Sequence, residues 1–265
     1  MKTARIIVLA GQSNAVGVGH CAYLTKHCNA EQVAKYRVGY ETVPVNYFSH
    51  DHRSGGFVAT KIGDAESSQD TFGPEVGIAQ WLTEHPQPEP HFIVKCAVGA
   101  TSLLQDWHAP EGWLYQELVK ILKESIMILE SQGYTPVVQA FCWMQGESDT
   151  CDEAAVSDYI GRYDGLLSAF KSEFAPYLED CVYVDAGISE IWPFYTRINE
   201  AKAAYAGARD RHLFIDTIAA GLTTKHEPEG APDIYHYDSD CVLKLGKLFA
   251  QYAICPPHNG LNQLG

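Results

Sequence analysis

Short apolar segments recur along the chain, and longer segments with apolar residues at helical spacing separate them. The short segments are rich in Val, Ile, Phe and Tyr and are apolar on both alternating faces. This pattern is typical of strands in a parallel sheet that helices cover on both sides. Strands are predicted at Arg5–Ala10, His91–Val98, Val137–Met144, Cys181–Gly187 and His212–Thr217.

The segments between these strands carry a helical repeat. After Trp113, for example, Leu114, Leu118 and Ile121 recur three or four residues apart, and the repeat stops at Gly133, a residue favoured just past a helix end. Helices are predicted at Pro74–Glu84, Trp113–Gln132, Ala154–Phe174, Tyr195–Ala208 and Asp240–Ala253. Strands that alternate with helices imply right-handed crossovers. The sequence therefore predicts an α/β fold, a three-layer α/β/α arrangement around a doubly wound, mostly parallel, five-stranded sheet.

One segment breaks the alternation. Residues 17–72 are rich in Gly, Tyr, His and polar residues without clear periodicity, so we expect a long loop insertion at about 17–72 within a single domain of residues 1–265. Its aromatic residues allow two interpretations, a platform for a sugar ring or packing of the loop onto the domain. These residues are Tyr36, Tyr40, Tyr47, Phe48 and Phe57.

Charge and composition exclude some partners. The chain has 19 basic and 33 acidic residues, a net charge of −14, which disfavours binding to nucleic acid or to an anionic membrane. The first apolar run, Ile6–Ala10, is too short for a signal peptide or a membrane span, so we expect a cytoplasmic protein with reduced cysteines. His50-Asp51-His52 has no evident third ligand, and neither a metal nor another cofactor is expected.

Two segments after predicted strands carry candidate groups for acyl transfer, at the sheet edge where open α/β sheets bind ligands. Gly11-Gln12-Ser13-Asn14 is either a turn of no chemical consequence or a turn that exposes Ser13 as a nucleophile. Gly99 follows the second strand, and its backbone amide is a candidate oxyanion donor, although an ordinary strand-to-helix turn is the plainer interpretation. Ser102 is a rival nucleophile without a supporting motif.

Two further segments supply an amide and acid–base groups. In Trp143–Asp149, Gln145 is a neutral donor suited to an oxyanion hole, and Glu147 and Asp149 are either carboxylates at a helix start or acceptors for sugar hydroxyls. In the segment 233–236, Asp233 is spaced to reach His236 as the carboxylate that orients a general base. Alone, an Asp-x-x-His segment is weak support for a triad.

Together the four segments resemble the SGNH hydrolase superfamily, whose fold is flavodoxin-like. Within it they resemble the branch of sialate O-acetylesterases and family 6 acetyl xylan esterases. Gly-Gln-Ser-Asn, Trp-x-Gln-Gly-Glu-x-Asp and Asp-x-x-His carry this resemblance, and Phe72-Gly73-Pro74-Glu75 adds to it. Small departures, such as Ala15 in place of a common methionine, leave the choice of substrate in doubt.

The resemblance implies a serine carbohydrate esterase that removes O-acetyl groups through an acyl-serine. The catalytic triad would be Ser13, Asp233 and His236. The oxyanion hole would be the Ser13 and Gly99 amides with the Gln145 side chain. Candidate substrate-binding residues are Gln12, Asn14, Glu147 and Asp149.

Several questions about function stay open at this stage. The substrate is an acetylated oligosaccharide or an O-acetyl sialic acid, and the anionic sialic acid would need a cation such as Arg53 or Lys61 at the pocket. An acetyl transferase with the same acyl-enzyme and a non-catalytic carbohydrate-binding protein are the alternatives. The oligomeric state is not readable from the sequence.

Overall fold

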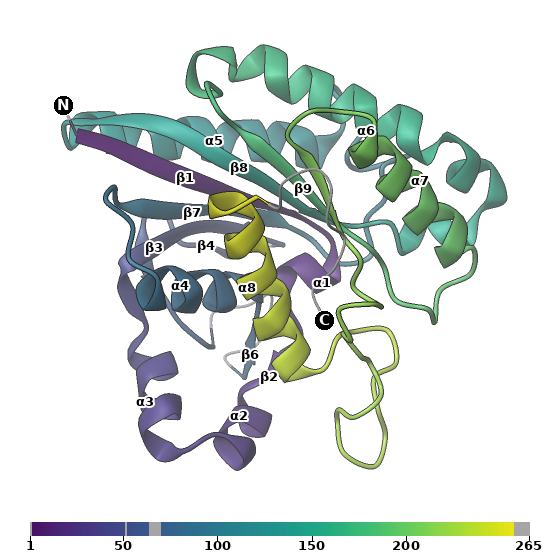
Figure 1. Ribbon diagram of the computed structural model, residues 1–265, viewed down its shortest axis with the longest axis horizontal. Helices are drawn as coiled ribbons and strands as arrows, with labels where there is room; N and C mark the ends of the chain where they lie inside the picture. Colours follow the sequence, from purple (N-terminus) through teal and green to yellow (C-terminus); the bar gives the residue numbers. More distant parts are fainter. Residues whose placement is uncertain (1, 51, 64–69, 257–265) are drawn as a thin grey trace.

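The predicted strands lie side by side in one sheet. The computed structural model describes residues 2–50, 52–63 and 70–256. The five predicted strands are β1 (Lys2–Gly11), β7 (His91–Ala97), β8 (Tyr134–Met144), β9 (Val182–Ala186) and β10 (His212–Ile215). They are parallel and lie in the order β7-β1-β8-β9-β10 (Figure 1). The predicted α/β class and parallel sheet are confirmed.

Helices cover both faces of this sheet, as the apolar strand pattern predicts. The five predicted helices are α4 (Pro74–Glu84), α5 (Trp113–Ser131), α6 (Glu153–Glu173), α7 (Tyr195–Gly207) and α8 (Ser239–Ile254). Helices α4 and α8 pack on one face, and α5, α6 and α7 lie on the other (Figure 1). All seven residues of β7 are buried, because both of its faces lie against helices.

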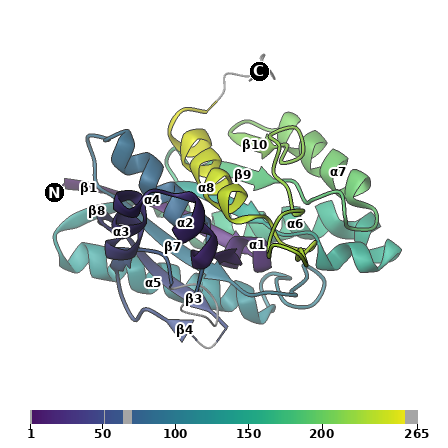
Figure 2. The ribbon, with the colours of Figure 1, turned by 90° about the horizontal axis from the view of Figure 1, so that it is seen from below.

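Among the described residues the sheet has eight strands, not five, and the described parts of the segment 17–72 are not a loop. It contains the short strands β2 (Gly19–His20), β4 (His52–Arg53), β5 (Val58–Thr60) and β6 (Thr71–Phe72), with helices α2 (Cys21–His27) and α3 (Ala30–Val38). Its longest strand, β3 (Tyr40–Ser49), pairs in parallel with β7, and β4 and β5 pair antiparallel with β3. Helices α2 and α3 lie beside the α4 and α8 layer (Figure 2).

The strand pattern of β3 is interrupted by Pro44, which cannot donate a ladder hydrogen bond. The pairing of β3 with β5 accordingly shifts register between Tyr40 and Val45. Proline is tolerated there because the regular parallel ladder with β7 begins only at Val45. The prediction of a loop failed because proline and alternating polar residues conceal a strand near the sheet edge.

Two sequence expectations about the whole chain can be compared with the structure. The eight cysteines are all free thiols, as expected. No helix among the described residues is both long enough and apolar enough to cross a membrane.

Candidate active site

Ser13 lies at a sharp turn where β1 ends at the sheet edge. It is the first residue of the short helix α1 (Ser13–Val16). The turn needs glycine at position 11, because Gly11 has φ +146° and a Cβ there would lie 1.9 Å from the carbonyl oxygen of Met144 in β8. The next amide, Gln12 N–H, donates to that same carbonyl at 3.0 Å. This hydrogen bond links the turn to β8, and Ser13 lies directly beyond the sheet edge.

His236 and Asp233 form a hydrogen-bonded pair in the loop before α8. His236 Nδ1 lies 2.6 Å from Asp233 Oδ2, and the two side chains are 25% and 33% exposed. Asp233 Oδ1 also accepts the Tyr235 amide at 3.1 Å, which holds the carboxylate in place. The expected contact between the two residues is present. With Nδ1 engaged, Nε2 is the ring nitrogen left to act on a substrate or a nucleophile.

Asn14 connects the serine turn to the histidine loop. Its Oδ1 accepts the Tyr237 amide at 3.0 Å, and its Nδ2 donates to the Tyr235 carbonyl at 3.5 Å. These two residues flank His236, so the residue after Ser13 is bonded to both neighbours of the histidine. Among the described residues no hydrogen bond joins Ser13 Oγ to His236. Such contacts are often long in an enzyme without substrate and shorten when it binds.

Gln145 is fully buried where three segments of the site meet. Its Nε2 donates to the Thr101 carbonyl at 3.0 Å, to Asp149 Oδ2 at 2.5 Å and to Gln12 Oε1 at 3.2 Å. Its Oε1 accepts the Tyr159 hydroxyl at 3.2 Å. Both N–H groups are thus already directed at protein acceptors. Its role as an oxyanion donor stays a prediction, and the geometry adds a second role, holding these segments together.

The Gly99 turn is bound to the serine turn from the other side. Val98 N–H donates to the carbonyl of Gly11 at 3.2 Å, which brings the residue before Gly99 beside the end of β1. Thr101 Oγ1 donates to the Val98 carbonyl at 2.7 Å and closes the turn. The segments that carry Ser13, Gly99 and Gln145 therefore meet at one sheet edge, as the order of the motifs predicts.

The four candidate substrate-binding residues are buried. Gln12, Asn14, Glu147 and Asp149 are each at most 2% exposed. Glu147 Oε1 accepts Asn14 Nδ2 at 2.8 Å, and Asp149 Oδ2 accepts the Leu103 amide at 3.1 Å as well as Gln145. Burial raises the pKa of both carboxyl groups. Substrate contact by these four residues stays a prediction, whereas their hydrogen bonds favour positioning of the serine turn and of Gln145.

Comparison with known proteins shows the family of the chain. Residues 3–255 match the family described as carbohydrate esterase, sialic acid-specific acetylesterase. The chain belongs to this family. No curated protein matches it in sequence. The chain is thus a carboxylic ester hydrolase of the carbohydrate O-acetylesterase type.

Solved structures show the same fold at low sequence identity. The esterase is similar to a protein from Arabidopsis thaliana, with TM-score 0.66 and 20% identity over 94% of this chain and 97% of that one. It is also similar to NanS, with TM-score 0.65 and 15% identity over 96% and 97% of the two chains. A carbohydrate acetylesterase from Xanthomonas citri gives 0.51 and 13%, over 95% of this chain and 56% of that one. At these identities the likeness concerns the fold alone, and it agrees with the predicted α/β fold.

Two buried lysines that support the candidate active site were not predicted from the sequence. Lys95 Nζ on β7 donates to Glu75 Oε2 at 2.7 Å and to the Val16 carbonyl at the end of α1 at 2.5 Å. A lysine inside an apolar strand was the only available signal for this pair, and Glu75 belongs to the Phe-Gly-Pro-Glu segment of the resemblance. The ion pair neutralises the charge of each partner. Lys95 also satisfies the carbonyl of Val16, three residues after Ser13.

The second buried lysine braces Gln145. Lys202 Nζ on α7 donates to the Gln145 carbonyl at 2.6 Å, to Asp185 Oδ1 at 2.8 Å and to the Ala186 carbonyl at 2.8 Å. Burial raises the pKa of Asp185 to about 6, although Lys202 acts in the opposite direction. Tyr159 donates to the same Gln145 carbonyl at 2.9 Å. Side chains from α6 and α7 therefore fix the backbone of Gln145 on the side facing away from β1, the strand that leads to Ser13.

Other candidates from the sequence lie outside the site. Tyr36, Tyr40 and Phe48 are at most 6% exposed, and Tyr47 and Phe57 pack against the core, so these aromatic rings attach segment 17–72 to the domain. This outcome favours the packing interpretation over a sugar platform.

The rival nucleophile and the possible metal ligands gain no support from the structure. Ser102 Oγ accepts the Gln105 amide at 3.1 Å within a local turn. Asp51 of the His-Asp-His run lies outside the described residues, and no group of three or more metal-binding side chains occurs in residues 2–50, 52–63 and 70–256.

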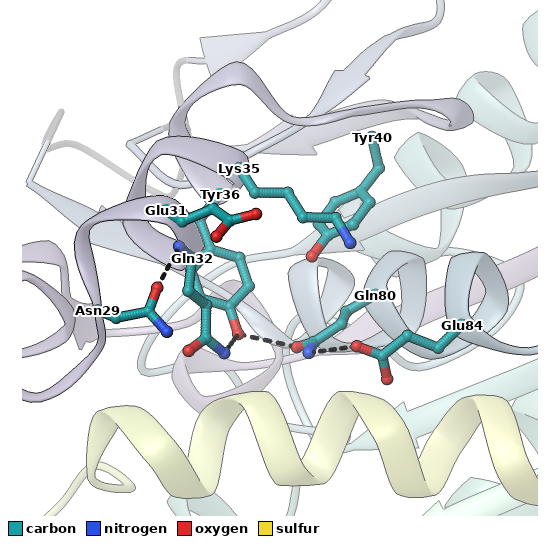
Figure 3. Close-up of a pocket in the computed structure, with 8 residues that line it drawn as sticks. All are labelled: Asn29, Glu31, Gln32, Lys35, Tyr36, Tyr40, Gln80 and Glu84. Carbon is teal, nitrogen blue, oxygen red and sulfur yellow. Dashed lines mark hydrogen bonds between the residues drawn. The ribbon is translucent and has the colours of Figure 1, made fainter.

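A separate pocket of about 210 Å³ lies between α3 and α4 (Figure 3). A chain of hydrogen bonds crosses it, from Gln32 to the Tyr36 hydroxyl at 3.1 Å, on to Gln80 at 2.9 Å and to Glu84 at 2.8 Å. Four of the eight side chains that line it are bonded to one another in this way, and none of the eight belongs to the candidate active site.

Proposed function

We propose that this carbohydrate O-acetylesterase works through Ser13 as nucleophile and His236 as general base. The observation that carries the proposal is the pair of hydrogen bonds by which Asn14, the residue after Ser13, holds both neighbours of His236. The contact of Asp233 with Nδ1 supports the same assignment, because it selects the tautomer whose Nε2 accepts a proton.

In the first half-reaction Ser13 Oγ bonds to the acetyl carbonyl carbon while His236 Nε2 takes the hydroxyl proton. The oxyanion of the tetrahedral intermediate accepts hydrogen bonds from the Ser13 and Gly99 amides and from the Gln145 side chain. To serve this purpose, the Gln145 side chain turns one of its two N–H groups from a protein acceptor, Thr101, Asp149 or Gln12, to the oxyanion. The bond to the sugar oxygen then breaks, and that oxygen takes the proton from His236.

The second half-reaction clears the enzyme. His236 takes a proton from water, the hydroxide oxygen bonds to the acetyl carbon, and the bond to Ser13 Oγ breaks. Acetate leaves and Ser13 regains its proton from His236. No metal or organic cofactor takes part in these steps. The substrate is an O-acetylated sugar.

The test compares Ser13→Ala with Ser102→Ala, a change of the same kind in the neighbouring turn. We expect Ser13→Ala to abolish release of acetate from acetylated sugars and turnover of p-nitrophenyl acetate, and Ser102→Ala to keep both. His236→Ala should be as inactive as Ser13→Ala because a serine without its base is a weak nucleophile. Normal turnover by folded Ser13→Ala would refute the mechanism. Product analysis with and without an acceptor sugar separates hydrolysis from acetyl transfer.

A further inference from the structure

An aromatic pair lies directly beside the candidate base. The ring centroids of Trp192 and Tyr235 are 5.2 Å apart at an interplanar angle of 46°. Tyr235 precedes His236 in the chain, and its carbonyl accepts Asn14 Nδ2. Trp192 comes from the segment between β9 and α7. Buried Tyr237 joins the loop after β9 to the loop before α8, because its hydroxyl donates to the Gly187 carbonyl at 3.2 Å.

These two loops also expose apolar side chains around the pair. Tyr235 is 50% exposed, and Ile191, Phe194 and Ile234 are 40–41% exposed. They make up four of the ten large hydrophobic residues that are exposed among the described residues. Scattered exposed apolar residues are normal, but a group of them beside a reactive centre marks a ligand-binding surface.

Backbone strain lies at the same place. Phe194 has φ +54° and ψ 15°, a left-handed conformation that is unfavourable for a bulky aromatic residue. Phe194 stays 41% exposed, so the fold buries its side chain only in part. The segment before α7 therefore presents the Phe194 ring to solvent at a cost to stability, and Trp192 beside it is partly buried against the core.

The cations near the pair are each bound by a carboxylate. The described segments 188–197 and 223–236 contain two cations other than histidine, and both are paired: Lys225 with Glu190 at 2.7 Å and Arg197 with Glu153 at 3.0 Å. Arg53, a sequence candidate for binding an anionic sugar, is paired with Glu117 and lies over the Phe48 ring. An anionic substrate would meet the chain's excess of acidic residues without a free cation from these positions.

From this arrangement we propose that Trp192 and Tyr235, flanked by Phe194 and Ile234, form the subsite for the ring of a neutral acetylated sugar. The apolar C–H face of the pyranose packs on the aromatic rings, and the Tyr235 hydroxyl is available to the ring hydroxyls. The acetyl group then extends toward Ser13 and His236. This inference rests on the proposed function, because it places the sugar relative to those two residues.

The experiment measures kcat and KM of Trp192→Ala and Tyr235→Ala for two esters, an acetylated xylo-oligosaccharide and p-nitrophenyl acetate. Met127→Ala, which truncates a 67% exposed residue on α5, is the matched control. We expect KM for the sugar ester to rise about tenfold in the two aromatic variants, since stacking contributes roughly that factor. For p-nitrophenyl acetate, which lacks the sugar, kcat/KM of Trp192→Ala should stay within about twofold of wild type.

Other results overturn the inference and leave the proposed mechanism intact. If Ser13→Ala is inactive while Trp192→Ala and Tyr235→Ala handle the sugar ester like the Met127→Ala control, the subsite is elsewhere. If the aromatic variants lose both esters equally, the rings support the catalytic centre and do not bind sugar. A wild-type kcat/KM that is higher for an O-acetyl sialic acid than for the neutral ester overturns the choice of a neutral sugar. Activity in Ser13→Ala, in contrast, refutes the mechanism itself.

Discussion

The buried pair of Lys95 and Glu75 offers a quantitative test of how the serine turn is held. The two side chains are 3% and 5% exposed, and Lys95 also satisfies the carbonyl of Val16. Replacing Lys95 with Met keeps a long apolar side chain of similar reach and removes only the charge and its hydrogen bonds. The Glu75 carboxylate then retains the hydrogen bond from the Gly73 amide at 3.2 Å.

The magnitude follows from the cost of an uncompensated buried charge. Removing one partner of a buried ion pair costs about 3–5 kcal/mol of unfolding free energy. In a chain of this size each kcal/mol lowers Tm by about 2–4 °C, so Lys95→Met should lose roughly 6–20 °C. Because Val16 ends the helix that begins with Ser13, kcat for p-nitrophenyl acetate should also fall at temperatures where the variant remains folded.

The assay is thermal unfolding followed by circular dichroism, with activity measured well below Tm. Glu89→Gln is the control, because it breaks the pair of Arg5 and Glu89, whose side chains are 26% and 35% exposed, and should cost less than about 1 kcal/mol. Combining Lys95→Met with Glu75→Leu should recover part of the lost stability, since no charge is then left buried. Equal Tm losses in Lys95→Met and Glu89→Gln would refute the reasoning.

Three further predictions concern the site and the response to acid. Asn14→Ala removes the hydrogen bonds to Tyr235 and Tyr237 and should therefore lower kcat for p-nitrophenyl acetate at least tenfold. The far-UV circular dichroism spectrum should stay unchanged, and a kcat within twofold of wild type would contradict this prediction. Gln145→Ala should lose about 10²–10³ in kcat if its side chain stabilises the oxyanion, and a loss of only a few-fold would assign it to positioning alone. Burial lowers the pKa of His212 to about 4, so the unfolded state binds the extra proton and stability is lost as pH falls from about 6.5 to about 4. Denaturant unfolding at pH 7 and 4.5 should therefore show a smaller loss for His212→Gln than for wild type, by at most about 3 kcal/mol, and equal losses would count against the assignment.

Local patterns in the sequence were sufficient for the regular elements of the fold. Helix α4 runs from Pro74 to Glu84 as predicted, because proline favours a first helical turn and apolar residues recur at the helical period. The five predicted strands, β1 and β7 to β10, were recognisable because strands buried on both faces are continuously apolar. Strand β3 was missed, because Pro44 and polar neighbours remove that local signal while pairing with β7 still stabilises the strand.

The motifs at strand ends predicted which segments would meet, since parallel strands bring their carboxyl ends to one edge. Sequence order thus predicted that the segments carrying Ser13, Gly99, Gln145 and His236 would meet at one sheet edge. It also predicted the contact between Asp233 and His236, which are only three residues apart.

Contacts between residues far apart in the chain were decided by tertiary structure. Packing of the chain buries Glu147 and Asp149 away from solvent. The pairing of Lys95 with Glu75 likewise depends on how α4 packs against β7. Trp192 and Tyr235 meet only because the loops after β9 and before α8 are adjacent at the sheet edge. A sequence specifies which side chains prefer burial or pairing, but the choice of partner depends on the distances that packing alone sets.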